Sequence, residues 1–194
     1  MWRYPCMIVG YVRLGLLALA LLVSFWAEGD WRLKIGVGCL IALSYSLDLL
    51  DGYLARKYNQ VTHVGSLFDL TIDLITHTVV WLRSGFYLAG LLVVLEWSTG
   101  LFIAAVSSRP ESHWKSNFTT ARPRLIQAYF QRGQHNWLSA YGNIAHGLFP
   151  LVWYLGLTHP IFYLLVTPGA LLYEIVTIYM LYAMAQVLAE ESSS

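Results

Sequence analysis

Charged residues are scarce in this chain. Of its 194 residues, 12% are charged and 57% are hydrophobic, whereas soluble domains average roughly 25% charged residues. The formal net charge is only +1, so no basic excess points to a nucleic-acid partner. Because a membrane-spanning helix needs about 20 mostly apolar residues, this composition predicts an integral membrane protein and argues against nucleic-acid binding.

Cysteine is also rare, with Cys6 and Cys39 as its two occurrences. Each lies beside or within an apolar run, where free cysteine usually acts as a small packing residue. We therefore expect neither a disulfide nor a cysteine metal site.

Long apolar runs fill most of the chain. Runs of this length without polar–apolar alternation indicate helices, which satisfy every backbone hydrogen bond within lipid. The sequence therefore predicts an all-α, polytopic membrane protein with six transmembrane helices. These form a single domain over 1–189, followed by a polar tail over 190–194. The expected spans are 5–26, 33–54, 65–82, 85–106, 137–157 and 160–189.

Lysine and arginine are distributed unequally between the two sides that six spans would create. Because basic loops tend to stay in the cytosol, we expect the termini and the 55–64 loop to be cytosolic. The long polar stretch over 107–136 lies on the same side, and 125–130 within it predicts a short interfacial helix. The cytosolic side carries Arg3, Arg56, Lys57, Arg109, Lys115, Arg122, Arg124 and Arg132, against Arg32, Lys34 and Arg83 opposite.

Four aspartates lie near the cytosolic ends of the second and third spans: Asp48, Asp51, Asp69 and Asp73. A carboxylate within lipid costs roughly 2.5–3.5 kcal/mol at the bilayer centre, and clustered carboxylates repel one another, so a cation must compensate them. Spacings of three and four residues place each pair on one helix face. Four hard oxygen donors from two helices predict Mg²⁺ or Mn²⁺, with two ions clamping a pyrophosphate.

Small and basic residues accompany these aspartates. Gly52 and Ala55 share the helix face of Asp48 and Asp51, and Gly65 opens the third span opposite them. Their small size predicts room for a nucleotide close to the backbone, although glycine also serves helix packing in membranes. Arg56 can bind phosphate oxygens as a bidentate donor.

The full pattern Asp48-x2-Asp51-Gly52-x2-Ala55-Arg56-x8-Gly65-x3-Asp69-x3-Asp73 resembles the signature of the CDP-alcohol phosphotransferase family. The resemblance implies six transmembrane helices, a two-metal site at the cytosolic face and attack of an alcohol on a CDP-linked donor with release of CMP. It further implies that all four aspartates are metal ligands and that Asp73 is the general base. Gly52, Arg56 and Thr62 match positions that contact the donor.

Within the family, the chain is similar to eukaryotic phosphatidylinositol synthases. The similarity lies in Pro5-x2-Ile8-x-Gly10-Tyr11-x-Arg13, in Asn59-Gln60-x-Thr62 and in Glu111-Ser112-His113-x-Lys115. It implies CDP-diacylglycerol as donor, myo-inositol as acceptor and an endoplasmic reticulum location if the source is eukaryotic. Cys6 and Leu74 depart from the pattern, since related proteins often have asparagine and a basic residue there.

Alternative functions remain open at the level of sequence. The same chemistry can use glycerol 3-phosphate, phosphatidylglycerol or an amino alcohol, but Thr71, Thr76, His77 and Thr78 in the third span favour a neutral acceptor. A divalent-cation transporter would also place aspartates in membrane helices, and a non-catalytic partner subunit is a third possibility. Polar residues in the later spans, Glu96, His146 and Glu174, predict helix–helix contacts. Glu174 is in addition a candidate for capping a polar pocket or for supporting a homodimer interface.

Overall fold

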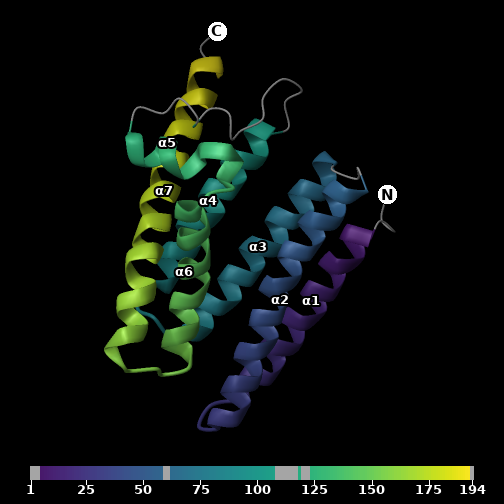
Figure 1. The fold of residues 1–194 in the computed structure, drawn as a ribbon, viewed down its shortest axis with the longest axis vertical. Helices are drawn as coiled ribbons and strands as arrows, with labels where there is room; N and C mark the ends of the chain where they lie inside the picture. Colours follow the sequence, from purple (N-terminus) through teal and green to yellow (C-terminus); the bar gives the residue numbers. More distant parts are fainter. Residues whose placement is uncertain (1–4, 59–61, 108–117, 119–122, 193–194) are drawn as a thin grey trace. The chain divides into compact units, whose positions relative to one another are not determined.

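The computed structural model describes residues 5–58, 62–107, 118 and 123–192. Within these ranges Asp51, Gly52, Ala55 and Arg56 are described only through their helical backbone. The described chain is helical throughout its regular structure, which confirms the expected all-α class (Figure 1).

Each of the six predicted apolar segments forms a helix. The short interfacial helix is also present, as α5 (Arg124–Phe130), and a 3₁₀ turn over Gln131–Gln134 follows it. Helix ends differ from the predicted ends by a few residues because polar residues extend α2 and α3 beyond the apolar runs. The long helices are α1 (Pro5–Ser24), α2 (Trp31–Lys57), α3 (His63–Ser84), α4 (Ala89–Ser107), α6 (Trp137–Tyr154) and α7 (Pro160–Ser192).

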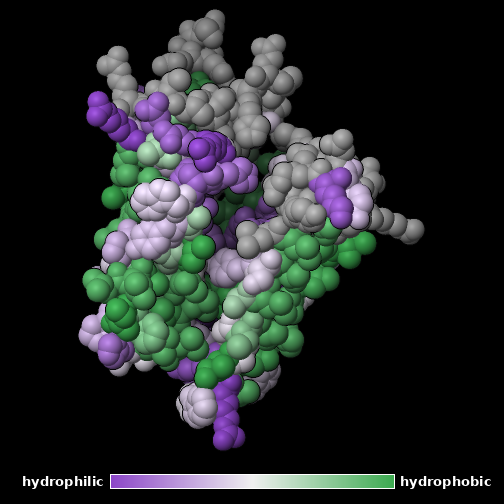
Figure 2. All heavy atoms as spheres, viewed as in Figure 1, coloured by the Kyte–Doolittle hydropathy of each residue, from purple (hydrophilic) through white to green (hydrophobic). Residues whose placement is uncertain are grey.

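Three of the described helices are long and apolar enough, by length and composition, to cross a membrane: Met7–Ser24, Ala89–Ser107 and Pro160–Ala189. Large hydrophobic side chains stay exposed on these helices, with Leu22, Leu101 and Leu164 at 55%, 64% and 69% exposure. Figure 2 shows hydrophobic side chains along the middle of the visible helices and hydrophilic ones near helix ends. Apolar faces of this kind suit lipid rather than water. The six-span topology stays a prediction.

The described residues divide into two compact units, one lying within Met1–Phe86 and Trp153–Gly156, the other within Tyr87–Val152 and Leu157–Ser194. The single domain predicted over 1–189 stays a prediction. Residues 190–192 of the predicted tail belong to the last turn of α7.

In the first unit α1 packs against both α2 and α3. The approach of α1 to α3 depends on Gly10, where an added Cβ would lie 2.7 Å from Phe68 Cε1 and 3.1 Å from Ile72 Cδ1. At the other end, an Arg83 Nη2 donates to the Ser24 carbonyl at 2.7 Å, and Gly85 ends α3 in the left-handed conformation with φ of 72°. These contacts hold both ends of α1 against α3. The contact at Gly10 lies one helical turn of α1 before Arg13.

In the second unit α7 packs against α4 and against α6. Gly169 of α7 has Ala145 Cβ and the Tyr141 ring of α6 against its backbone, and the Tyr141 hydroxyl donates to the Leu165 carbonyl at 2.9 Å. Small residues at a helix crossing let backbones approach closely, as is typical of membrane bundles. The apolar core beside this crossing contains Ala145, Val152 and Val166.

Candidate metal and active site

Three of the four predicted aspartates converge in the first unit. Asp48 comes from α2, and Asp69 and Asp73 come from α3, where their spacing of four places them on one face. Their carboxylate oxygens lie within 4.8 Å of one another. Asp51 lies within α2, but its side chain lies outside the described residues, so its part in the cluster stays a prediction.

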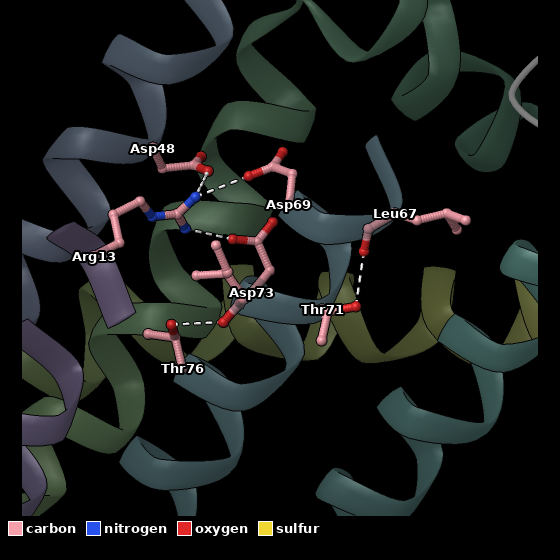
Figure 3. Close-up of polar contacts among 8 residues, drawn as sticks. Arg13, Asp48, Leu67, Asp69, Thr71, Asp73 and Thr76 are labelled. Carbon is pink, nitrogen blue, oxygen red and sulfur yellow. Dashed lines mark hydrogen bonds and ion pairs between the residues drawn. The ribbon is translucent and has the colours of Figure 1, made fainter. Parts of the chain in front are cut away.

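Arg13 of α1 lies at the centre of this cluster (Figure 3). Its Nη1 is 2.7 Å from Asp48 Oδ1 and 2.8 Å from Asp69 Oδ1, and its Nη2 is 2.6 Å from Asp73 Oδ1. These short distances are typical of charge-assisted hydrogen bonds. Arg13 was not predicted from the sequence to belong to the site, although a lone arginine in an apolar helix indicates a buried partner.

Burial differs between the arginine and the aspartates. The Arg13 side chain is fully buried, whereas the side chains of Asp48, Asp69 and Asp73 are 34%, 45% and 38% exposed. The guanidinium therefore closes the site from the protein interior, and the carboxylates are open on the other side.

The donor set fits a divalent cation. Carboxylate oxygens are the ligands that Mg²⁺ and Mn²⁺ prefer, and oxygens from two helices already converge on one positive charge, the Arg13 guanidinium. Opposite ligands of an octahedral Mg²⁺ lie about 4 Å apart, since each bond is about 2.0–2.1 Å. The oxygens of Asp48, Asp69 and Asp73 lie within 4.8 Å of one another. Small side-chain rotations would bring them to the spacing of metal ligands.

The predicted donor contacts are only partly within the described structure. The side chains of Ala55 and Arg56 lie outside it, and Gly52 is described only as part of the α2 backbone. Thr62 is the N-cap of α3, and its Oγ1 accepts a hydrogen bond from the Gly65 amide at 3.0 Å. An added Cβ at Gly65 would lie 3.0 Å from the same Thr62 oxygen. Both residues thus have a capping role that sequence analysis missed, and donor binding by them stays a prediction.

The threonines of α3 bond to their own helix. Thr71, Thr76 and Thr78 donate to the carbonyls of Leu67, Ile72 and Leu74, each at 2.7 Å. Their protons are therefore used locally, a common arrangement for threonine within helices. Only acceptor lone pairs are left for a polyol, which weakens the argument that these hydroxyls favour a neutral acceptor. His77 lies in ring contact with Tyr45 of α2, at 5.9 Å between centroids.

A second polar cluster lies in the other unit, among α4, α6 and α7. His146 Nε2 is 3.0 Å from Glu96 Oε1, and His146 Nδ1 is 3.1 Å from Glu174 Oε1. The Tyr173 hydroxyl donates to Glu96 Oε1 at 3.2 Å, and its ring stacks on the imidazole at 3.9 Å. The helix–helix contacts predicted for these polar residues are present, but the sequence did not indicate that they meet each other.

The interfacial helix α5 is held against α6 by Tyr129. Its hydroxyl donates to Asn143 Oδ1 at 2.6 Å, and its ring lies 3.0 Å from where a Cβ at Gly142 would be. Burial raises the pKa of the Tyr129 hydroxyl, so it stays a hydrogen-bond donor at neutral pH.

Comparison with known proteins places the chain in a class. The sequence model of the CDP-alcohol phosphatidyltransferases matches residues 5–130, well over half of the chain. The matched region contains the whole aspartate cluster and Arg13. The chain therefore belongs to the CDP-alcohol phosphatidyltransferase family, which are membrane transferases of phospholipid synthesis.

Individual relatives differ in the acceptor that they are named for. The chain is 29% identical over 114 residues to the probable CDP-diacylglycerol–inositol 3-phosphatidyltransferase 2 of Arabidopsis thaliana, covering 58% of this chain. It is 37% identical over 73 residues, 38% of the chain, to the CDP-diacylglycerol–inositol 3-phosphatidyltransferase of Saccharomyces cerevisiae. A third relative, the CDP-diacylglycerol–glycerol-3-phosphate 3-phosphatidyltransferase of Rickettsia felis, is 38% identical over 53 residues, 27% of the chain.

The matched stretches cover 44%, 30% and 29% of these three proteins, so the chain aligns with less than half of each relative's length. No solved structure matches the chain.

Proposed function

We propose that this chain transfers the phosphatidyl group of CDP-diacylglycerol to myo-inositol, giving phosphatidylinositol and CMP. The observation that carries the proposal is the convergence of Asp48, Asp69 and Asp73 from two helices, within 4.8 Å, inside the matched region. Two relatives are named for inositol as acceptor, which favours this polyol.

In this proposal Asp48, Asp51, Asp69 and Asp73 hold two divalent ions, Mg²⁺ or Mn²⁺. When bound, these ions neutralise the pyrophosphate of the donor and stabilise the charge that develops during displacement. Arg56, Gly52, Ala55, Thr62 and Gly65 line the path of the CDP group, with the first as the phosphate-binding cation.

Asp73 acts as the general base. An inositol hydroxyl oxygen forms the new bond to the phosphatidyl phosphorus, the bond from that phosphorus to the CMP phosphate oxygen breaks, and CMP leaves. The proton of the hydroxyl passes to an Asp73 carboxylate oxygen. Asp73 suits this role because it is the aspartate of α3 farther from the helix N-terminus, and its side chain is 38% exposed on the open side of the site.

The acceptor assignment is tested with a panel of alcohols. Purified chain, CDP-diacylglycerol and Mg²⁺ are combined with one alcohol per reaction, and CMP release is measured. We expect the rate with myo-inositol to exceed the rate with glycerol 3-phosphate by at least about tenfold, since one lost polar contact already costs about 1.4 kcal/mol. A clear preference for glycerol 3-phosphate, the acceptor named for the Rickettsia relative, would reject inositol and leave the reaction type standing.

We further propose six membrane spans with the site facing the cytosol, as the basic residues of the loops favour. The same assay in sealed vesicles of known orientation tests this placement. Because inositol does not cross lipid unaided, external inositol should support CMP release only when the cytosolic face points outward. Release only in the opposite orientation would reject the topology. We also propose that the chain forms a homodimer.

A further inference from the structure

The guanidinium of Arg13 occupies the oxygens that are the candidate metal ligands. Nη1 contacts Asp48 and Asp69, one from each of the two helices, at 2.7 and 2.8 Å, and Nη2 contacts Asp73 at 2.6 Å. A divalent cation bound between Asp48 and Asp69 would need the position of Nη1, because metal–oxygen bonds are only about 2.0–2.1 Å long. The arginine and the metal therefore use the same oxygens.

Charge and burial make the Arg13 guanidinium and a divalent metal ion alternative partners of the three carboxylates. Arg13 has no exposed side-chain surface, and a buried guanidinium is strongly destabilising unless carboxylates compensate it. The three carboxylates in turn repel one another without a cation. Arg13 approaches them from the interior through the close contact of α1 with α3 at Gly10, while their open side stays accessible to an ion.

We propose that Arg13 is a built-in counter-cation of the metal site, which holds the carboxylates together before the metal binds and competes with the metal for them. Arg13 thereby sets the affinity of the site for divalent cations as a positioning residue. The proposal rests on the proposed function, because it takes the cluster to be a metal site.

The test measures metal binding without turnover. Full-length chain purified in detergent is titrated with Mn²⁺ alone, and free Mn²⁺ is followed by electron paramagnetic resonance. Removing a positive charge within hydrogen-bond distance of the ligands should tighten binding, and we expect Arg13→Gln to lower the Mn²⁺ dissociation constant by at least about tenfold. Arg13→Lys keeps the charge but cannot bond all three carboxylates as a planar fork, so its constant should lie between wild type and Arg13→Gln.

Arg83→Gln is the matched control. Arg83 belongs to α3 and bonds to the Ser24 carbonyl at 2.7 Å, away from the aspartates, so its loss should leave Mn²⁺ affinity within about twofold. Equal or weaker Mn²⁺ binding by Arg13→Gln than by wild type would overturn the inference while leaving the metal site intact. Absence of Mn²⁺ binding by wild type would overturn the proposed site and this inference with it.

Arg13→Gln could unfold without metal because three carboxylates would then be uncompensated. In that case Arg13→Lys decides the question. Mn²⁺ binding several-fold tighter than wild type supports competition by the arginine, and equal or weaker binding overturns it. The rise in melting temperature caused by a fixed Mn²⁺ concentration gives a second readout, since tighter binding to the folded state stabilises it more.

Discussion

Asp73→Asn should lower the rate of CMP release by about 10³-fold, while CDP-diacylglycerol still binds in the presence of Mg²⁺. Removal of a positioned general base typically costs 10²–10⁴-fold in rate. The asparagine keeps the shape of the side chain and one oxygen for coordination, but it cannot take the acceptor's proton. Asp48 and Asp69 remain to hold the metal and, through it, the donor.

Comparison of Asp73→Asn with Asp48→Asn separates the loss of the general base from the loss of a metal ligand. Asp48→Asn weakens the metal site itself, so it should raise the dissociation constant of the donor and lower the rate together. Initial rates and equilibrium donor binding are measured for both variants. Asp30→Asn is the matched control, because Asp30 lies before α2 and accepts from the Arg32 amide at 2.8 Å. Appreciable turnover by Asp73→Asn would remove Asp73 from the role of base.

His146→Leu should destabilise the protein by about 3–5 kcal/mol, the usual cost of removing one partner from a buried ion pair. The imidazole lies between Glu96 and Glu174, which are only 3% and 13% exposed. Both carboxylates approach the same imidazole, with Glu96 Oε1 at 3.0 Å from Nε2 and Glu174 Oε1 at 3.1 Å from Nδ1. Leucine would leave two buried carboxylates facing each other.

Thermal unfolding in detergent measures this effect. His159→Leu is the matched control, because His159 is exposed between α6 and α7. Its Nδ1 accepts one hydrogen bond, from the Ile161 amide at 3.3 Å, so His159→Leu should lower the melting temperature far less than His146→Leu. Replacing Glu96 and Glu174 by glutamine in the His146→Leu background removes both carboxylate charges and should restore much of the loss. An unchanged melting temperature for His146→Leu would contradict the packing of α4, α6 and α7 around this cluster.

The sequence predicts the helices well because each apolar run carries its own signal. The four-residue spacing of Asp69 and Asp73 likewise places them on one face of α3 without any knowledge of packing. The capping role of Thr62 was missed because the donor motif and an N-cap both place a small hydroxylic residue before a helix. The helical hydrogen bonds of Thr71, Thr76 and Thr78 depend on rotamers, which a sequence does not specify.

The contacts that α1 and the later helices make through their polar residues were not predicted from the sequence. Arg13 is 35 residues from Asp48, and nothing in the spacing of either residue indicates the other. One signal was available, since Arg13 is the sole charged residue over 4–27 and an intramembrane charge needs a partner. Glu96, His146 and Glu174 come from three helices and meet only because those helices pack together.

The most direct test of the central claim, that Asp48, Asp69 and Asp73 form a divalent-cation site for phosphatidyl transfer, is CMP release before and after metal removal. Purified chain with CDP-diacylglycerol and myo-inositol is assayed in EDTA and again after addition of excess Mg²⁺ or Mn²⁺. We expect no release above background in EDTA and recovery when the metal is restored. Undiminished CMP release in EDTA would contradict a divalent-cation site at these aspartates.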